Sequence, residues 1–137
     1  MENILRKATL DDSNFVLNIR NKSYVRNNSW NNKLIDMTEH SAFWLDNYQS
    51  YWIIQTEGNH KPIGFIRVKN NEVSIALEKK YWNGEYGRCA MDKISKIYPK
   101  LKAEVKLDNI HSLCFFIKCG FVPKGYILKK EENRNEI

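Results

Sequence analysis

The fold is decided by residues 73–88, which read VSIALEKKYWNGEYGR. The first five of these residues are typical of a strand, and the last seven place Gly84 and Gly87 among aromatic residues, as in a tight turn. After the turn, four apolar side chains recur at helical spacing, namely Ala90, Met91, Ile94 and Tyr98. Pro99 ends this helix. The stretch therefore predicts a strand that passes through a glycine-bearing turn into a helix.

The residues before this stretch predict the rest of a sheet. Strands are expected at residues 4–8, 51–56, 63–68 and 73–77, and a turn is expected at residues 57–60. Asn70 and Asn71 join the last two of these strands. Asparagine is common in turns, so this pair of strands is expected to form an antiparallel hairpin.

Two helix starts are expected between the first and second strands. Thr9 followed by Asp12 fits a capping box, in which both side chains bond to main-chain amides that the helix leaves unpaired. Asp36 followed by Glu39 is a second start of this kind. The segment between the two helices, residues 22–33, is rich in Asn and Ser and is expected to form a loop.

The C-terminal part predicts two further strands and one helix. Strands are expected at residues 101–107 and 121–129. Asp108 and Asn109 begin the helix between them, and Gly120 suits the left-handed position that ends it. The apolar side chains expected to face inward are Leu113, Phe116 and Ile117. The predicted order of elements is therefore β-α-α-β-β-β-α-β-α-β.

Length and charge restrict the class of protein. The chain has 137 residues, which suits one domain, expected at residues 1–129 with a charged tail at 130–137. Its net charge of +6 favours an anionic partner such as a polyphosphate cofactor, although solubility alone also explains it. No run of five basic residues occurs, so a nucleic-acid partner is not expected.

Cysteine usage and hydropathy indicate a cytoplasmic protein. Cys89, Cys114 and Cys119 form no C-x-x-C pair, and the histidines are scattered, so we expect neither disulfides nor a metal site. No stretch approaches the roughly 20 apolar residues of a membrane span. The polar start of the chain does not resemble a secretory signal.

Two stretches resemble the GCN5-related N-acetyltransferase (GNAT) family. Residues 82–88 are similar to its acetyl-CoA loop, Q/R-x-x-G-x-G/A, after the fourth strand. Residues 109–121 are similar to its N-x-x-S/A-x-x-x-Y-x-x-x-G-F helix. The order of elements agrees over nearly the whole chain. The resemblance implies the GNAT fold, an α/β (α+β) architecture with a mixed central sheet of about six strands and four helices.

The same resemblance implies acetyl-CoA as the acetyl donor. In the family the fourth and fifth strands splay apart, which leaves the main chain at Ile75 and Leu77 open to the pantetheine arm. The amides that begin the following helix are suited to a pyrophosphate, because they are unpaired and lie at the positive end of the helix dipole. The remaining residues expected to bind the cofactor are Trp82, Asn83, Gly84, Tyr86, Gly87, Arg88, Asn109, Ser112 and Phe116.

Three positions depart from the family pattern. Trp82 replaces the usual Gln or Arg, and Glu85 stands where the middle glycine is expected, with Arg88 near enough to offset its charge. Phe116 stands where many members carry a tyrosine that protonates the leaving thiolate. Phenylalanine has no proton to donate. Ser112 or water is therefore expected to replace that tyrosine as the donor.

The first half of the chain resembles GNAT enzymes that acetylate amino sugars of nucleotide-linked precursors. The residues that carry this likeness, and that are expected to line the acceptor pocket, are Arg20, Asn21, Arg26 and Trp44, with Glu39 and His40 between them. Guanidinium groups bind phosphate through paired hydrogen bonds, so Arg20 and Arg26 are expected to face a sugar nucleotide. Candidate general bases are His40, Glu39 and Glu72, with His40 preferred because its ordinary pKa is near neutrality.

Three functional hypotheses remain open at this point. The chain is an amino-sugar nucleotide N-acetyltransferase acting on a primary amine, a protein or peptide N-terminal acetyltransferase, or a degenerate GNAT domain that binds CoA or a partner without catalysis. The sequence does not indicate the oligomeric state.

Overall fold

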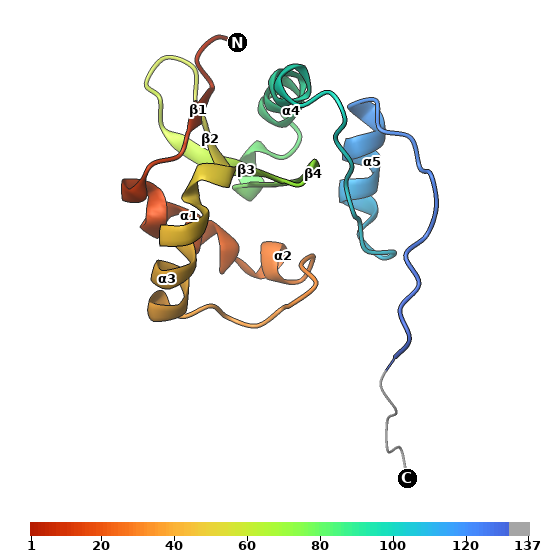
Figure 1. Cartoon of the computed structure of the whole chain (residues 1–137). Coiled ribbons are helices and arrows are strands. Elements are labelled where there is room, and N and C mark those ends of the chain that lie inside the picture. The colour runs from red at the N-terminus through yellow and green to blue at the C-terminus, as the bar shows by residue number, and fades with distance from the viewer. Residues whose placement is uncertain (132–137) are drawn as a thin grey trace.

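Four antiparallel strands form the central sheet of residues 1–131, the part of the chain that this computed structural model describes (Figure 1). Their spatial order is β1-β2-β3-β4. The strands are β1 (Leu5–Lys7), β2 (Tyr51–Gln55), β3 (Pro62–Lys69) and β4 (Glu72–Leu77). Each strand pairs only with its neighbour in the chain, so the four make a simple meander.

Helices cover both faces of this sheet. The α-helices are α1 (Ser13–Arg20), α2 (Ser23–Arg26), α3 (Met37–Asn47), α4 (Tyr86–Ile97) and α5 (Ile110–Lys118). Short 3-10 turns are η1 (Leu10–Asp12), η2 (Tyr48–Ser50) and η3 (Lys79–Tyr81). Figure 1 shows α1 and α3 together on one side of the sheet and α4 on the other. Four of the α-helices have eight or more residues, which matches the expected number.

Two buried clusters follow from the alternation of side chains along the strands. On one face Ile53 and Phe65 pack with Val16, Ile19 and Trp44 of α1 and α3. On the other face the core is built by β-strand residues and by α4, and it comprises Ile4, Ile54, Ile63, Ile66, Val68, Val73, Leu77, Ala90, Met91, Ile94 and Phe116. The sheet therefore separates an α1/α3 layer from an α4 layer.

The hairpin turn and two of the predicted helix ends are confirmed, whereas the segment 22–33, which was expected to be a loop, contains α2. Asn70 and Asn71 both have positive φ, 53° and 63°, as the two central residues of a type I′ hairpin turn require. The Asp36 carboxylate accepts a hydrogen bond of 2.7 Å from the Glu39 amide and begins α3. Gly120 ends α5 with φ 94°.

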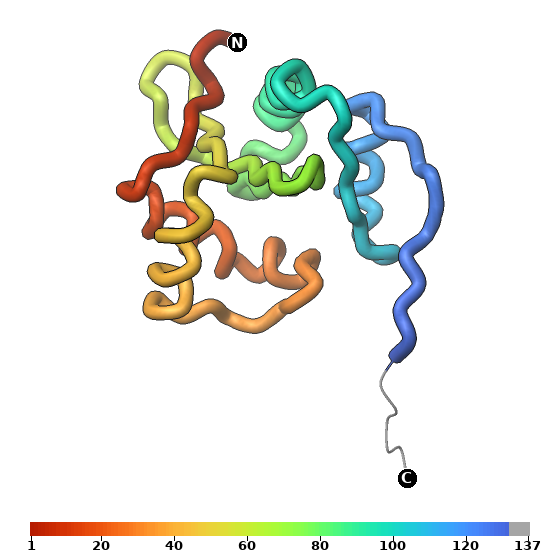
Figure 2. Tube along the Cα trace, in the orientation of Figure 1, coloured from red at the N-terminus to blue at the C-terminus, as the bar shows by residue number. Residues whose placement is uncertain are grey.

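The strand predicted at residues 101–107 is wrong except at one residue. Lys102 forms a single parallel bridge with Glu72, and its carbonyl accepts from the Val73 amide at 2.9 Å. Beyond Lys102 the chain leaves β4, and Figure 2 follows it from the end of α4 to the start of α5. Pairing requires a partner within hydrogen-bond reach, and β4 supplies one only at Lys102.

The strand predicted at residues 121–129 is also wrong, because no strand forms there. Its neighbour in a six-stranded sheet would be the segment 101–107, which is itself outside the sheet. The side chains of Val122, Tyr126 and Leu128 are accordingly 64%, 86% and 91% exposed. The mixed α+β class is confirmed, with four strands in place of about six. Of the predicted charged tail, residues 132–137 lie outside the described residues.

Candidate active site

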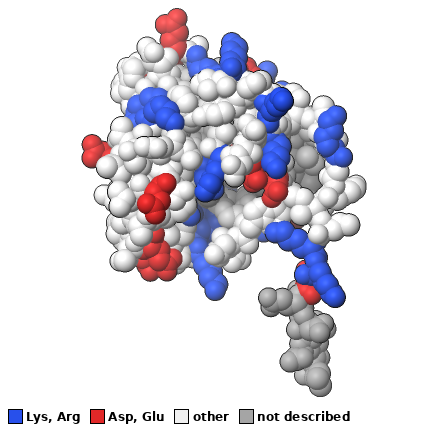
Figure 3. Space-filling model, in the orientation of Figure 1, with Lys and Arg blue, Asp and Glu red and all other residues white. Residues whose placement is uncertain are grey.

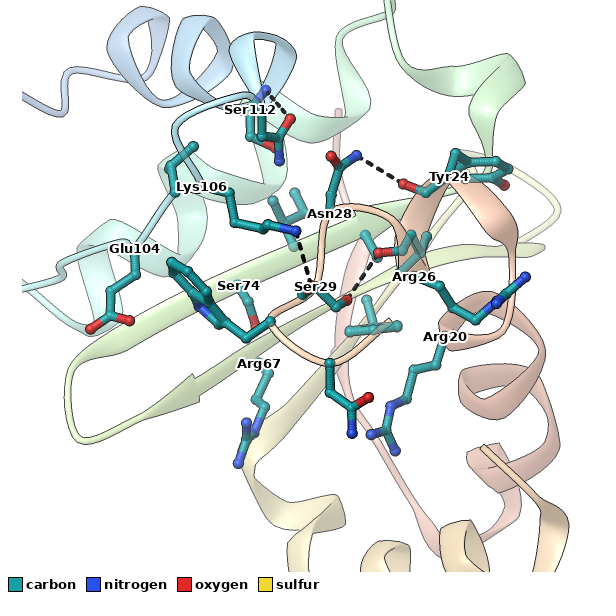
Figure 4. Close-up of a pocket in the computed structure, with 18 of the residues that line it drawn as sticks. Arg20, Tyr24, Arg26, Asn28, Ser29, Arg67, Ser74, Glu104, Lys106 and Ser112 are labelled. Atoms are coloured by element: carbon teal, nitrogen blue, oxygen red, sulfur yellow. Dashed lines mark hydrogen bonds between the residues drawn. The ribbon is translucent and has the colours of Figure 1, made fainter. Parts of the chain in front are cut away.

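A cavity of about 590 Å³ opens beside β4. One wall is β4 itself, from Glu72 to Leu77. A second wall is formed by residues 104–106 and the start of α5, and a third by α2 and the loop that follows it. Lys106 joins the second and third walls, because its Nζ donates to the carbonyls of Asn27 and Ser29 at 3.3 and 3.5 Å (Figure 4).

The outer edge of β4 presents unpaired main chain to this cavity. In an antiparallel ladder alternate residues bond to the neighbouring strand, and Glu78 donates to Ile63 at 2.8 Å. By that alternation Val73, Ile75 and Leu77 face away from β3. The Val73 amide bonds to Lys102, whereas no described residue bonds to the main chain of Ile75. The open edge expected at Ile75 is therefore present.

Trp82 covers the end of this edge. Its indole Nε1 donates to the Leu77 carbonyl at 3.0 Å. The ring stacks on His111 of α5 with centroids 4.5 Å apart, and the Tyr24 ring meets it edge-on at 5.1 Å. Trp82 thus links β4 to α2 and α5 and engages a carbonyl that was expected to be open. Neither this covering role nor the stacking on His111 was anticipated from sequence.

The N-terminus of α4 supplies the amides expected for a pyrophosphate. The Cys89 amide bonds to the Glu85 carbonyl at 2.9 Å, so the amides of residues 86–88 precede the first helical hydrogen bond. A Cβ added at Gly84 would meet only the Tyr81 carbonyl oxygen, at 3.6 Å, so nothing in the fold crowds this position. Asn83, Glu85 and Arg88 are exposed around it.

Gly87 and Tyr86 have structural roles at the same helix start. A Cβ on Gly87 would lie 2.9 Å from Cε1 of Phe115 and 3.3 Å from Cδ1 of Leu77, so this glycine lets α4 pack closely against α5 and β4. The Tyr86 hydroxyl accepts from the Glu57 amide at 3.1 Å and ties the helix to the β2–β3 turn. Their side chains therefore hold the helix start in place.

The start of α5 forms a polar end to the cavity. The Asn109 side chain accepts from the Ser112 amide at 3.2 Å and donates to the Ser112 hydroxyl at 2.8 Å. Ser112 Oγ therefore keeps its own proton available for donation. Phe116, one turn further on, contributes an apolar wall and packs edge-on against Phe121 with centroids 5.0 Å apart.

At the opposite end of the cavity, His40 is buried and both its ring nitrogens are engaged. Arg20 Nη1 lies 3.1 Å from His40 Nδ1, and the Ser13 carbonyl oxygen lies 2.9 Å from His40 Nε2. Because arginine can only donate, Nδ1 accepts and Nε2 carries the proton that is donated to Ser13. Burial lowers the pKa of His40, and the charge of Arg20 lowers it further. His40 consequently positions Arg20 and has no nitrogen left to accept a proton from an amine.

The other residues expected at the acceptor pocket hold the surrounding chain. The Asn21 side-chain amide bonds twice to the main chain of Ile35, at 2.8 and 2.9 Å. Arg26 donates to the carbonyls of Asn21 and Asn32, at 3.1 and 3.2 Å. Trp44 is buried and shares its indole N–H between the Thr9 and Leu10 carbonyls, both at 3.2 Å. Arg20 and Arg26 line the cavity, whereas Asn21 and Trp44 do not.

Several cavity residues were missed by the sequence-based interpretation, chiefly Arg67, Tyr51 and Glu104. Arg67 lies opposite Ser74 in the β3–β4 register, and both side chains line the cavity. The sequence does contain an indication of this role, because Arg67 is the one charged residue between Ile63 and Val68 of an otherwise apolar strand. Its side chain shares a face of the sheet with the side chains two positions away. The carboxylates that line the cavity are Glu39, Glu72 and Glu104.

Charged side chains of both signs lie on the rest of the surface (Figure 3). Lysine and arginine side chains are dispersed among acidic ones on the face shown in Figure 3. Among residues 1–131, no group of three or more His, Cys, Asp or Glu side chains could hold a metal ion. No helix in the same range is long and apolar enough to cross a bilayer.

The chain resembles known proteins in both sequence and fold. A family model described as the acetyltransferase (GNAT) family matches residues 14–121. No curated protein matches the chain. A solved domain from Methanocaldococcus jannaschii DSM 2661 has a TM-score of 0.74 and 21% identity, over 97% of this chain and 92% of that one.

Two further solved structures carry functional names. A ribosomal-protein-alanine N-acetyltransferase from Brucella melitensis has a TM-score of 0.70 and 18% identity, over 88% of this chain and 85% of that one. A phosphinothricin acetyltransferase from Sinorhizobium meliloti, in complex with AcCoA, has a TM-score of 0.70 and 16% identity, over 88% and 75%. At these identities the structures establish a common fold.

The family model spans every element that forms the cavity, from α1 through β4 and the turn at residues 82–85 to α5. The chain therefore belongs to the acetyltransferase (GNAT) family, and it is an acetyltransferase.

Proposed function

We propose that the chain transfers an acetyl group to the primary amine of a small-molecule acceptor that occupies the α1/α3 end of the cavity. The observation that supports this most is that a single cavity connects the two ends of the site. It is lined both by the open edge of β4 at Ile75 and by Arg20 and Arg67. Donor and acceptor groups placed at its two ends would meet beside β4. Holding two reactants in this way supplies much of an enzyme's acceleration.

The residues present fit acetyl-CoA. The Ile75 main chain offers a donor and an acceptor along the cavity, and the amides of residues 86–88 lie at the positive end of α4. Gly84 leaves room beside those amides. When bound, acetyl-CoA supplies an acetyl group activated as a thioester. Trp82 is the residue that fits least readily, because it already engages the Leu77 carbonyl.

The chain's own groups suit acyl transfer to an amine. The Ile75 amide can stabilise negative charge that develops on an oxygen beside β4. An amine must lose its proton before it attacks, and Glu39, Glu72 and Glu104 are the carboxylates at hand in the cavity wall. Ser112 Oγ can return a proton at the α5 end, because its hydrogen bond from Asn109 leaves its own hydrogen unused.

An amino-sugar nucleotide is the acceptor class that we propose to test first. The likeness of residues 20–44 to enzymes of that kind supports it, and so does the closure of the cavity by Lys106, which reaches across to Asn27 and Ser29. A cavity bridged in this way favours a compact acceptor over an extended peptide. The two neighbours named above act, by their names, on a ribosomal-protein alanine and on phosphinothricin, so peptides and amino acids belong in the same panel.

The proposal is tested with Ile75→Pro, assayed by acetyl-CoA consumption over that panel. Proline removes the Ile75 amide hydrogen, which faces the cavity, and spares the β3–β4 ladder, whose bonds are made by the alternate residues. We expect turnover to fall by about 10²- to 10³-fold, as when one oxyanion donor is removed. The matched control Ile75→Val keeps the amide and should keep turnover.

Melting temperatures separate catalysis from folding in this test. Both variants should melt close to the parent protein. Full turnover of a folded Ile75→Pro variant would contradict the proposed role of the β4 edge, and a parent protein that acetylates nothing in the panel would contradict the proposed function itself.

A further inference from the structure

Two guanidinium groups lie near the same aromatic ring, that of Phe43, at the acceptor end of the cavity. Arg20 comes from α1 and Arg67 from β3, and their Cζ atoms lie 4.7 and 5.8 Å from the centroid of Phe43. Arg67 also lies 5.9 Å from the ring centroid of Tyr51. Figure 4 shows both side chains extending toward the same side of the cavity, with Arg26 directed elsewhere. The pair is therefore held together by packing.

Among residues 1–131, no carboxylate forms an ion pair or a hydrogen bond with either guanidinium. The ion pair between Arg6 and Asp12 lies outside this cavity. Arg67 Nε is buried and has no hydrogen-bond partner among residues 1–131. Arg20 uses Nη1 on His40 and retains its other donors. Both arginine side chains are half-buried. Buried polar atoms in proteins are normally hydrogen-bonded, so the unpartnered Arg67 Nε, beside a second guanidinium that no carboxylate pairs with, indicates a missing anion.

The electrostatics of the pair agree with that conclusion. Burial lowers the pKa of Arg20, the Tyr51 hydroxyl acts in the opposite direction, and the charge of Arg67 lowers the pKa again. Arginine nevertheless stays protonated in proteins. Two like charges are consequently kept close in a partly desolvated wall, an arrangement that is unfavourable alone and that an oxyanion would stabilise.

The surrounding residues fix the geometry of the pair. His40 receives the Arg20 hydrogen bond, is itself anchored on the Ser13 carbonyl, and stacks on Trp44 at 5.7 Å. Arg67 is set by its register opposite Ser74 in the β3–β4 hairpin. Preorganised donors of this kind lose little freedom when a ligand binds, which is a property of built binding sites.

We infer that Arg20 and Arg67 form an anion-binding subsite that takes a carboxylate or phosphate carried by the amine acceptor. The inference rests on the proposed function for the statement that the anion belongs to the acceptor. It assigns the anion to Arg20 and Arg67 and leaves Arg26 to the loop, because Arg26 is already bonded to the Asn21 and Asn32 carbonyls. Planar guanidinium groups are suited to both anions through paired hydrogen bonds.

The first test measures binding without any acetyl transfer. Inorganic phosphate and acetate are titrated into the full chain and into Arg67→Gln, in the absence of acetyl-CoA, and the shift in melting temperature is recorded. The parent protein should be stabilised and Arg67→Gln should lose that response. Lys69→Gln, which removes an equal charge from the same face of β3, is the matched control and should keep it.

The second test measures specificity. Three amine acceptors are compared: glucosamine 6-phosphate, glutamate, and glucosamine, which carries no anionic group. We expect Arg67→Gln to lower kcat/KM about 10- to 100-fold for the acceptor with the preferred anion and to leave glucosamine nearly unchanged. Comparison of glucosamine 6-phosphate with glutamate identifies whether the subsite prefers a phosphate or a carboxylate. Arg67→Lys keeps the charge without the planar fork, and it serves if Arg67→Gln fails to fold.

The outcomes distinguish the subsite from the proposed function. Loss of the phosphate or acetate response in Arg67→Gln supports the subsite even if no amine is acetylated. Acetylation of glucosamine as efficiently as of both charged acceptors, with no effect of Arg67→Gln on any of them, would overturn the subsite and leave the acetyltransferase proposal standing. An anion response that survives in both Arg67 variants would overturn it as well.

Discussion

Phe116 occupies the cavity wall where a proton donor would be useful, and this makes it the most direct residue to change. It is 7% exposed and lies one turn beyond Ser112 on α5. We predict that Phe116→Tyr raises turnover by less than about 10²-fold, because general acid catalysis is typically worth 10²- to 10⁴-fold and a thiolate is a tolerable leaving group.

Steady-state kinetics with acetyl-CoA check this prediction. Phe121→Tyr is the control, because Phe121 packs against Phe116 without lining the cavity, and it should leave turnover unchanged. A Phe116→Tyr variant that folds and turns over no faster than the parent protein would show that proton return does not limit the reaction.

At the residue scale, motif positions could be predicted from sequence and the partners of isolated charged residues could not. Asn109 was expected to cap a helix and does, because the capping partner Ser112 is only three residues away. His40 was preferred as a base, yet it bonds to Arg20 and Ser13, 20 and 27 residues away. Whether a lone histidine is buried or accessible depends on such long-range packing, which local spacing does not report.

Gly84, in the turn before α4, and Gly87, in the first turn of α4, are required for different reasons. A Cβ at position 84 makes only an ordinary van der Waals contact with the Tyr81 carbonyl oxygen, at 3.6 Å, whereas a Cβ at position 87 would lie only 2.9 and 3.3 Å from atoms of Phe115 and Leu77. We predict that Gly87→Ala lowers the free energy of unfolding by about 1–3 kcal/mol through overpacking. Gly84→Ala should leave that free energy nearly unchanged and weaken CoA binding instead.

Urea denaturation and calorimetry with CoA measure the two effects separately. If Gly87→Ala were as stable as the parent protein, Phe115 would have to move aside at no cost. If Gly84→Ala bound CoA as tightly as the parent protein, close approach of a ligand at this position would be contradicted.

Among the elements, those specified by local chemistry were predicted, and those that depend on a distant partner were missed. Two positive-φ asparagines are enough to make the β3–β4 hairpin, because its strands are adjacent in the chain. The segment 101–107 alternates apolar and polar residues, and the segment 121–129 is rich in apolar residues, but each needs a strand brought from elsewhere. Only Lys102 finds one. The resulting gap beside β4 is what opens the cavity.

At the scale of the whole molecule, a neutral histidine in the core couples folding to pH. The pKa of His40 is lowered in the folded state, mainly by burial and then by Arg20. The unfolded chain therefore binds a proton, near an ordinary pKa of about 6.5, that the folded chain does not bind. The contribution of His40 is complete above that pH and is lost as the pH falls below it.

Asp12 acts in a separate, more acidic window. Burial alone would raise its pKa, but hydrogen bonds from Arg6 and Thr9 lower it below its ordinary value. Its contribution to stability is consequently present above about pH 4 and is lost only as the pH falls further. The two groups can thus be distinguished by the pH at which stability declines.

We therefore predict that the free energy of unfolding, measured by urea denaturation, falls between pH 6.5 and 5 and that His40→Gln removes most of this slope. Glutamine can still accept from Arg20 and donate to the Ser13 carbonyl, so the variant preserves the hydrogen bonds while losing the titration. His60→Gln, on the β2–β3 turn, is the matched control in which the slope should persist. An equal slope in His40→Gln would mean that some other group, and not the buried imidazole, makes the protein sensitive to mild acid.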